Sequence, residues 1–180
     1  MKTQSLIKEL SEMTQNNINE IQALKELPIK KLRQKESPNT WNALECIEHL
    51  NRYSDFYISE IRKRIEKSKY KASETFESGF IGDYFAKMML PKENMNKINT
   101  FKSMNPKDCF LDKGVLEKFI QQQEQILKLL EMSKKTDLKK VKVSISIAKW
   151  IKLRLGDILR VVVYHNLRHI EQAKRATQLK

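Results

Sequence analysis

The chain is poor in the residues that interrupt helices or link segments covalently. Its 180 residues include only four glycines, four prolines and two cysteines, against 40% hydrophobic and 32% charged residues. So few glycines and prolines leave little room for tight turns and favour long helices. The two cysteines, Cys46 and Cys109, form no CxxC pair and provide no disulfide framework. This scarcity predicts a reducing compartment, and we expect the cytoplasm.

Long apolar runs are also missing. No stretch approaches the ~18 apolar residues that a membrane span requires. The first 13 residues are amphipathic and lack the apolar core of a signal peptide. We therefore expect no membrane partner. A chain of this length can bury a sizeable core, so residues 1–180 are predicted to form a single domain.

Acidic residues are outnumbered, with 22 against 35 lysines and arginines, which gives a net charge of +13. The lysines are nevertheless spread over most of the chain. The densest groups, within residues 62–71 and 134–142, fall at or beyond the ends of predicted helices, where cations interact well with the helix dipole. No basic stretch is interleaved with aromatic residues in the manner of a nucleic-acid-binding segment. Nucleic acid is therefore disfavoured as a partner, and the charge indicates solubility and loose association.

Apolar residues recur with helical spacing in four long segments and one short one. The long helices are predicted at about residues 3–24, 42–66, 115–132 and 156–177, and the short one at 81–90. Asn42 and Glu45 have the spacing of a capping box at the start of the second long helix. Together these segments predict an all-α four-helix bundle. A long, partly helical connector joins its second and third helices, which allows those two to run parallel.

Two segments outside the long helices carry weaker signals. Residues 141–147 alternate like a strand, but no partner for a sheet is evident nearby, so we interpret them as an extended connector. Within the connector between the second and third helices, we expect Met88, Met89 and Met95 to fill gaps beneath it.

Histidine is scarce as well, and its placement is informative. His165 and His169 are four residues apart in a predicted helix, so their Cβ atoms lie ~6 Å apart on one face and can chelate one divalent cation. The remaining histidine, His49, lies about two turns into the second long helix. If these helices pack together, the three rings can converge at a similar depth. The alternative for each histidine is an ordinary residue on a helix face with a hydrogen bond to a neighbour.

The motifs around these histidines resemble the DinB/YfiT-like superfamily. They are W-N-x-x-E-x-x-x-H-L at residues 41–50 and H-N-x-R-H-x-x-Q at residues 165–172. The resemblance implies an up-down-down-up four-helix bundle with a divalent metal held by His49, His165 and His169. Members with known activity include metal-dependent transferases and isomerases that use low-molecular-weight thiols such as bacillithiol or mycothiol.

Three imidazoles around one metal ion leave a coordination position open, as in catalytic zinc sites. A thiol or water bound there would ionise near neutral pH. Zinc or nickel is favoured, while manganese or iron would also fit nitrogen ligands. The expected function is a metal-dependent enzyme, a thiol-dependent S-transferase or related hydrolase acting on a small molecule. The alternative is a non-enzymatic helical bundle for interaction or stress response, able to form a homodimer, with a structural metal or none.

Three further residues are candidates for catalysis, each with a simpler alternative. Glu45 could orient the imidazole of His49, or serve only in the capping box. Gln172 could hydrogen-bond a ligand or substrate, or be an ordinary surface amide. Arg168 could pair with the carboxylates of an anionic thiol, or be solvated or paired near Glu171.

The cysteines and two tyrosines also have two interpretations each. Cys46 could be taken for a ligand or nucleophile, but a small buried hydrophobic residue is favoured because no base lies beside it. Cys109 has no evident partner. Tyr53 and Tyr164 could line a pocket, although packing in the core is favoured for both.

Overall fold

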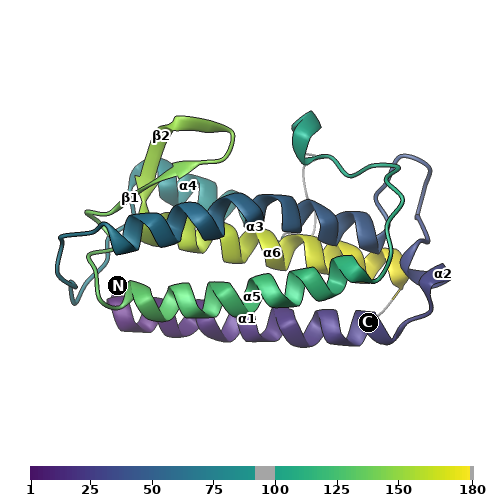
Figure 1. Ribbon diagram of the computed structural model, residues 1–180, viewed down its shortest axis with the longest axis horizontal. Helices are drawn as coiled ribbons and strands as arrows, with labels where there is room; N and C mark the ends of the chain where they lie inside the picture. The colour runs from purple at the N-terminus through teal and green to yellow at the C-terminus, as the bar shows by residue number, and fades with distance from the viewer. Residues whose placement is uncertain (92–99, 179–180) are drawn as a thin grey trace.

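The computed structural model describes residues 1–91 and 100–178, and within them the chain is mostly helical with one small two-stranded sheet (Figure 1). Met95 lies outside the described residues, so its expected packing stays a prediction. The elements in chain order are α1 (Thr3–Glu26), α2 (Ile29–Leu32), α3 (Ala43–Glu66), α4 (Phe80–Met89), the 3-10 turn η1 (Lys102–Met104), α5 (Gly114–Ser133), β1 (Lys142–Ile145), β2 (Ala148–Arg154) and α6 (Leu155–Thr177).

Helix α3 begins where the capping box predicts. The side chain of Asn42 accepts a hydrogen bond from the backbone nitrogen of Glu45 at 2.9 Å. The carboxylate of Glu45 accepts one from the backbone nitrogen of Asn42, also at 2.9 Å. Two of the donors that a helix start leaves unsatisfied are thereby paired, which fixes the first turn of α3 and the direction in which its side chains project.

The four long helices pack side by side along most of their length (Figure 1). Helix α1 packs against α5 and α6, and α3 packs against the same two helices from the other side. The side chain of Lys113, at the start of α5, donates to the backbone oxygen of Lys25 near the end of α1 at 2.6 Å. Asn51 in the first half of α3 donates to the backbone oxygen of Val115 at 2.9 Å, so α3 and α5 begin at the same end of the molecule.

Buried apolar side chains between these helices form two clusters. One surrounds Ile61, Phe76 and Leu159 at the end that carries the hairpin. The other surrounds Leu44 and Phe119 at the opposite end. The periodic apolar residues of the sequence thus face inward, as a helical period of 3.6 requires.

The prediction that residues 141–147 form an unpaired connector is wrong. β1 pairs antiparallel with β2, with Val143 opposite Leu153 and Ser144 opposite Lys152. The turn between the strands occupies residues 146 and 147 and contains none of the glycine or asparagine that usually marks a hairpin. Because the turn lacks these residues, the sequence does not indicate that β2, with its lysines, pairs with β1.

Helix α4 lies against the first turn of α6. The carboxylate of Asp157 accepts a hydrogen bond from the backbone nitrogen of Gly79 at 2.9 Å, and Arg160 pairs with Asp83 at 2.9 Å. Gly82 allows this close approach, because a Cβ atom there would lie 2.2 Å from Asp157 Oδ2. Docked in this way, α4 contributes Phe85, Met88 and Met89 to the wall of a cavity that residues of α3 and α6 also line.

No helix among residues 1–91 and 100–178 combines the length and apolar character needed to cross a bilayer.

Candidate metal centre

The three histidines meet in space, although 116 residues separate His49 from His165. One nitrogen atom of each ring lies within 4.8 Å of one nitrogen atom of each of the other two. His49 comes from α3 and is buried, whereas His165 and His169 come from successive turns of α6 and are half-buried. The Nε2 atoms of His49 and His165 are 3.3 Å apart. Two nitrogens bound to a tetrahedral zinc at ~2.05 Å lie about 3.3 Å apart, so this spacing fits a shared divalent ion.

Two oxygen atoms set the tautomers of His49 and His169. The Nδ1 atom of His49 lies 2.7 Å from the backbone oxygen of Met104, and Nδ1 of His169 lies 2.9 Å from Oε1 of Gln172. Because an oxygen of this kind can only accept, each Nδ1 carries the proton and each Nε2 has its lone pair free. Donation of the second ring nitrogen to an oxygen is the usual support of a metal-binding histidine.

The surroundings keep all three rings neutral at physiological pH. Burial lowers the pKa of His49 to about 4 and that of His169 to about 3. Burial also lowers the pKa of His165 well below its ordinary value, and repulsion from His169 and His49 when they are protonated, and from the Arg168 cation, lowers it further. A neutral imidazole is the form that binds a metal, so no proton has to be displaced from the coordinating nitrogens near pH 7.

Two aromatic rings enclose the histidines. The ring of Trp41 lies 4.8 Å from His49 and 5.8 Å from His169, measured between centroids. The ring of Tyr53 stands edge-on to His49 at 4.9 Å and to His165 at 5.0 Å. These contacts restrict ring rotation and exclude water from the sides of the cluster.

The cluster opens into a cavity of about 1140 Å³. Residues of α3 and α6 line it together with α4, the hairpin and the loop after residue 100. Apolar walls come from residues such as Phe85, Met89 and Val162, while Lys107 and Arg175 supply positive charge. A cavity of this volume accommodates a small organic molecule beside the histidines.

The comparison with protein families agrees with this geometry. A model of the DinB superfamily matches residues 12–173. The chain belongs to the DinB superfamily. The match contains α3 and α5 completely, most of α1 and α6, and all three histidines of this member of the DinB superfamily. A search of curated proteins and a search of solved structures each gave no match.

The structure places the three predicted catalytic candidates differently. Glu45 serves in the capping box, and its Oε1 also accepts from Lys35 at 3.0 Å and from the backbone nitrogen of Asp108 at 2.7 Å. Among the described residues, it is Met104 rather than Glu45 that meets Nδ1 of His49. Glu45 therefore serves in the capping box, the second of the two roles considered for it, and also supports the loop above α3. A role in orienting the imidazole of His49 stays a prediction.

Gln172 and Arg168 both line the cavity. The hydrogen bond between Gln172 and His169 shows that this amide supports a member of the cluster rather than only facing solvent. Arg168 donates to the backbone oxygen of Met88 at 3.2 Å, which ties α6 to the end of α4. A role for Arg168 toward an anionic thiol stays a prediction.

The structure also places the two cysteines and the two tyrosines considered in the sequence analysis. Cys46 is fully buried in the apolar core, as predicted, and burial raises the pKa of its thiol. Tyr164 is buried in the core. Tyr53 packs on the core but also lines the cavity, so both positions considered for it, core and pocket, apply. Cys109 does have a partner, since its sulfur lies 3.6 Å from Nη2 of Arg52.

Sequence reasoning missed Met104 and Arg52. Met104 contributes a backbone oxygen, for which no side-chain identity is required, and it lies 55 residues from the histidine it supports. Arg52 lies one turn after His49 on α3, and this spacing was available as a signal.

Proposed function

We propose that this DinB protein is a metal-dependent enzyme whose ion is held by His49, His165 and His169. The convergence of three neutral imidazoles at an open cavity carries this proposal. The acceptors at Nδ1 of His49 and His169, the 3.3 Å between the Nε2 atoms of His49 and His165, and the two enclosing aromatic rings support it. Zinc or nickel suits such a nitrogen set, and manganese or iron is the secondary choice.

We further propose thiol transfer to a small electrophile, or a related hydrolysis, as the reaction. When bound, a divalent ion with an open position would lower the pKa of a thiol or water ligand and provide a nucleophile near neutral pH. The chain itself supplies orientation and shelter. Phe85 and Met89 offer an apolar wall for the electrophile, and the cations Lys107 and Arg175 at the cavity favour a thiol that carries carboxylates.

The test compares protein loaded with zinc or nickel with metal-free protein and with His165→Ala. Transfer is measured with each of a panel of low-molecular-weight thiols and the electrophile 1-chloro-2,4-dinitrobenzene. Hydrolysis is measured with p-nitrophenyl acetate. Turnover that requires the metal and disappears in His165→Ala supports the proposal. A tightly bound ion without turnover of either probe would favour the non-enzymatic alternative, in which the metal is structural.

We also propose that α1, α3, α5 and α6 form a single-domain four-helix bundle with up-down-down-up connectivity. The contact between Lys113 and Lys25 supports opposite directions for α1 and α5. The ion pair of Lys174 with Glu20 at 3.0 Å supports a common direction for α6 and α1. This connectivity would bring α3 and α6 together as neighbours, which the histidine cluster requires.

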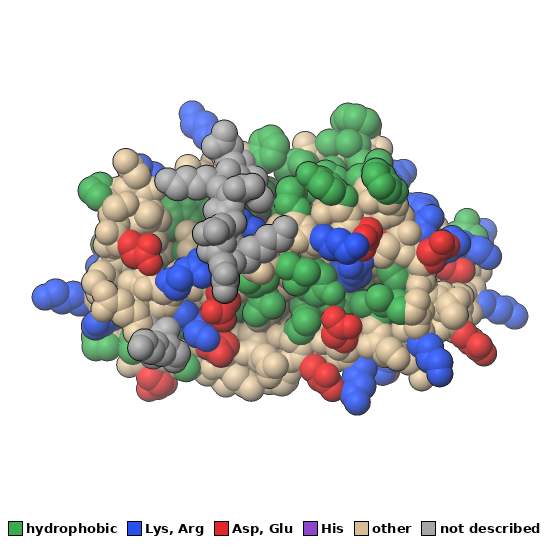
Figure 2. Space-filling model, turned by 180° about the vertical axis from the view of Figure 1, so that it is seen from behind, with side chains coloured by type: hydrophobic (Ala, Val, Ile, Leu, Met, Phe, Trp, Pro, Cys, Tyr) green, Lys and Arg blue, Asp and Glu red, His purple; other side chains and the backbone are tan. Residues whose placement is uncertain are grey.

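Other partners and the compartment are inferred from the surface and the cysteines. Figure 2 shows lysine and arginine side chains scattered among acidic ones on the face seen from behind. We therefore do not propose a nucleic-acid partner. Cys46 and Cys109 are both free thiols, which supports a cytoplasmic location.

A further inference from the structure

The loop of residues 101–109, here called the covering loop, supplies the oxygen that supports His49. It passes beside α3, and the backbone oxygen of Met104 in its short 3-10 turn accepts the proton of His49 Nδ1 at 2.7 Å. The loop is largely exposed, and only Pro106 within it is buried. Such a segment needs anchors if its backbone oxygen is to stay at a fixed distance from an imidazole.

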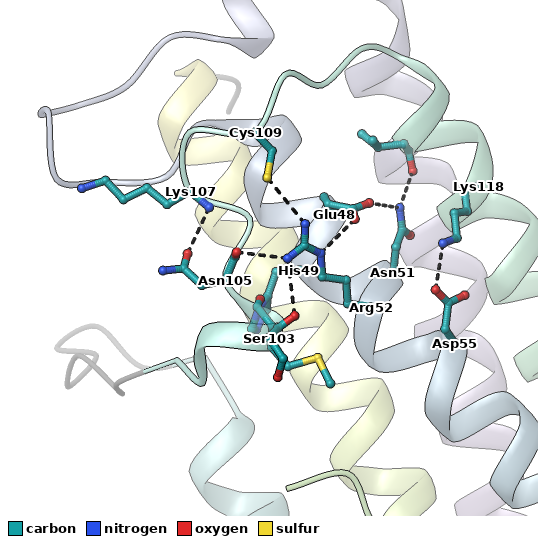
Figure 3. Close-up of polar contacts among 12 residues, drawn as sticks. Glu48, His49, Asn51, Arg52, Asp55, Ser103, Asn105, Lys107, Cys109 and Lys118 are labelled. Atoms are coloured by element: carbon teal, nitrogen blue, oxygen red, sulfur yellow. Dashed lines mark hydrogen bonds and ion pairs between the residues drawn. The ribbon is translucent and has the colours of Figure 1, made fainter.

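Arg52 provides the anchor next to this oxygen. Its Nη1 atom donates to the backbone oxygens of Asn105 at 3.0 Å and Ser103 at 3.4 Å, the two residues that flank Met104 (Figure 3). Its Nη2 atom contacts the sulfur of Cys109 at 3.6 Å. The guanidinium is itself held by Glu48, whose Oε1 lies 3.0 Å from Nε.

A second anchor lies on the opposite side of His49. Glu45, one turn earlier on α3, accepts from the backbone nitrogen of Asp108 at 2.7 Å. The covering loop is therefore tied to the same helix before and after the histidine, by side chains at positions −4 and +3 relative to it. Glu45 also caps α3, whereas the contacts of Arg52 beyond its own helix all go to the covering loop.

We propose that Arg52 is a positioning residue of the metal centre, which holds the Met104 carbonyl on Nδ1 of His49 and so keeps Nε2 aimed at the metal. This inference rests on the metal site proposed above. Supports of this kind typically change metal affinity 10–100-fold when they are removed. Arg52 acts through the loop rather than on the histidine directly, so we expect about a tenfold loss in Arg52→Gln, at the lower end of that range.

Charge alone makes the opposite prediction. Arg52 is a cation near a divalent ion, and its removal would strengthen metal binding if repulsion were its main effect. Arg52→Lys keeps the charge but cannot reach Glu48 and two carbonyls at once with a single ammonium group. We expect Arg52→Lys to bind the metal more weakly than the wild type and at least as tightly as Arg52→Gln.

The matched control is Arg64→Gln. Arg64 also pairs with a glutamate four residues earlier on α3, and 30% of its side chain is exposed against 27% for Arg52. Its further contact goes to Ser144 of the hairpin instead of the covering loop. Zinc affinity is measured for all variants by competition with a chromophoric chelator. Weaker binding in Arg52→Gln with wild-type affinity in Arg64→Gln supports the inference, and equal or tighter binding in Arg52→Gln overturns it.

A measurement on metal-free protein separates this inference from the proposed function. In ¹⁵N-labelled protein, the Nδ1 proton of His49 is expected as a protected resonance because the Met104 oxygen accepts it. Its exchange with solvent is expected to accelerate at least tenfold in Arg52→Gln and to stay unchanged in Arg64→Gln. If wild-type protein binds no metal, the proposed function fails while this readout still decides whether Arg52 holds the carbonyl. Unchanged exchange in Arg52→Gln would overturn the role of Arg52 even in a protein that binds zinc.

Discussion

Helices α3 and α6 each have two faces that contrast in chemistry. The inner face of α3 carries Leu50, and that of α6 carries Ile170; both are at most 1% exposed and lie in the apolar core. The outer faces carry His49, His165 and His169, which surround an open cavity. His49 and Leu50 are adjacent in sequence, yet the ~100° turn per residue of a helix sends one to the cavity and the other to the core.

This contrast separates stability from chemistry on the same helices. The inner faces bury apolar surface and hold the helices together. The outer faces carry neutral polar rings at the cavity, with His165 and His169 half-buried and His49 buried. The covering loop and two aromatic residues hold these rings in place. Changes on the two faces should therefore have different consequences, which the following predictions test.

The largest effect is expected from acid. The folded state holds His49 and His169 neutral down to about pH 4 and about pH 3, whereas an unfolded chain protonates them near pH 6.5. Below pH 6.5 the unfolded state thus binds more protons, and the free energy of unfolding falls as the pH falls, by up to about 1.4 kcal/mol per pH unit for each histidine. Urea unfolding of metal-free protein between pH 7 and 4.5 checks this. The variant with all three histidines changed to glutamine should lose much of this dependence, and an equal slope in both proteins would contradict the account.

On the inner face, Leu50→Ala should lower the free energy of unfolding by about 2–5 kcal/mol, because it leaves a cavity in a closed core. Tyr53→Ala, three residues later on the outer face, should cost less, since Tyr53 is half-buried and borders an existing cavity. Urea unfolding of both metal-free variants measures the difference. If Tyr53→Ala proved as costly as Leu50→Ala, the division between the two faces would not hold.

The docking of α4 over the outer face should be sensitive at Gly82. A methyl group there would meet the carboxylate of Asp157, so Gly82→Ala should lower the free energy of unfolding by about 1–3 kcal/mol. In an ordinary helix the same substitution is stabilising. Gly79→Ala is the control, because the nearest atom to its Cβ, at 3.3 Å, belongs to the flexible side chain of Arg154. Gly79→Ala should lower the free energy of unfolding by less than about 1 kcal/mol. Thermal unfolding compares the two, and a neutral or stabilising Gly82→Ala would show that α4 is not held in this way.

The smallest effect is expected from the support of His169. Gln172→Ala removes the acceptor of its Nδ1 proton and should weaken zinc binding about tenfold without unfolding the protein. Glu171→Ala is the neighbouring control; its carboxylate pairs with Lys174 at 3.4 Å. Competition with a chelator measures both affinities. Equal affinities would mean that Gln172 does not orient the ring.

Much of this arrangement could be predicted from the sequence where the signal is local. The capping box of Asn42 and Glu45 placed the start of α3, and the spacing of His165 and His169 placed both rings on one face of α6. The meeting of His49 with this pair required packing between distant helices. It was predicted from equal depth and from family resemblance rather than from any local rule.

The parts that escaped prediction depend on backbone atoms and unusual turns. The Met104 oxygen that supports His49 could belong to almost any residue, so the identity of residue 104 carries no signal. The hairpin turn at residues 146 and 147 lacks the residues that mark such turns. The role of Gly82 likewise depends on tertiary packing, because the close approach of Asp157 is what requires a glycine there.

The metal content of the untagged protein tests the central claim most directly. The chain is incubated with zinc, nickel or manganese, freed of excess ion, and analysed by plasma mass spectrometry beside His165→Ala, with circular dichroism to confirm equal helicity. We expect about one divalent ion per chain in the wild type and a loss of that ion in His165→Ala. A helical wild-type protein that retains none of these ions, or a variant that retains as much as the wild type, would contradict it.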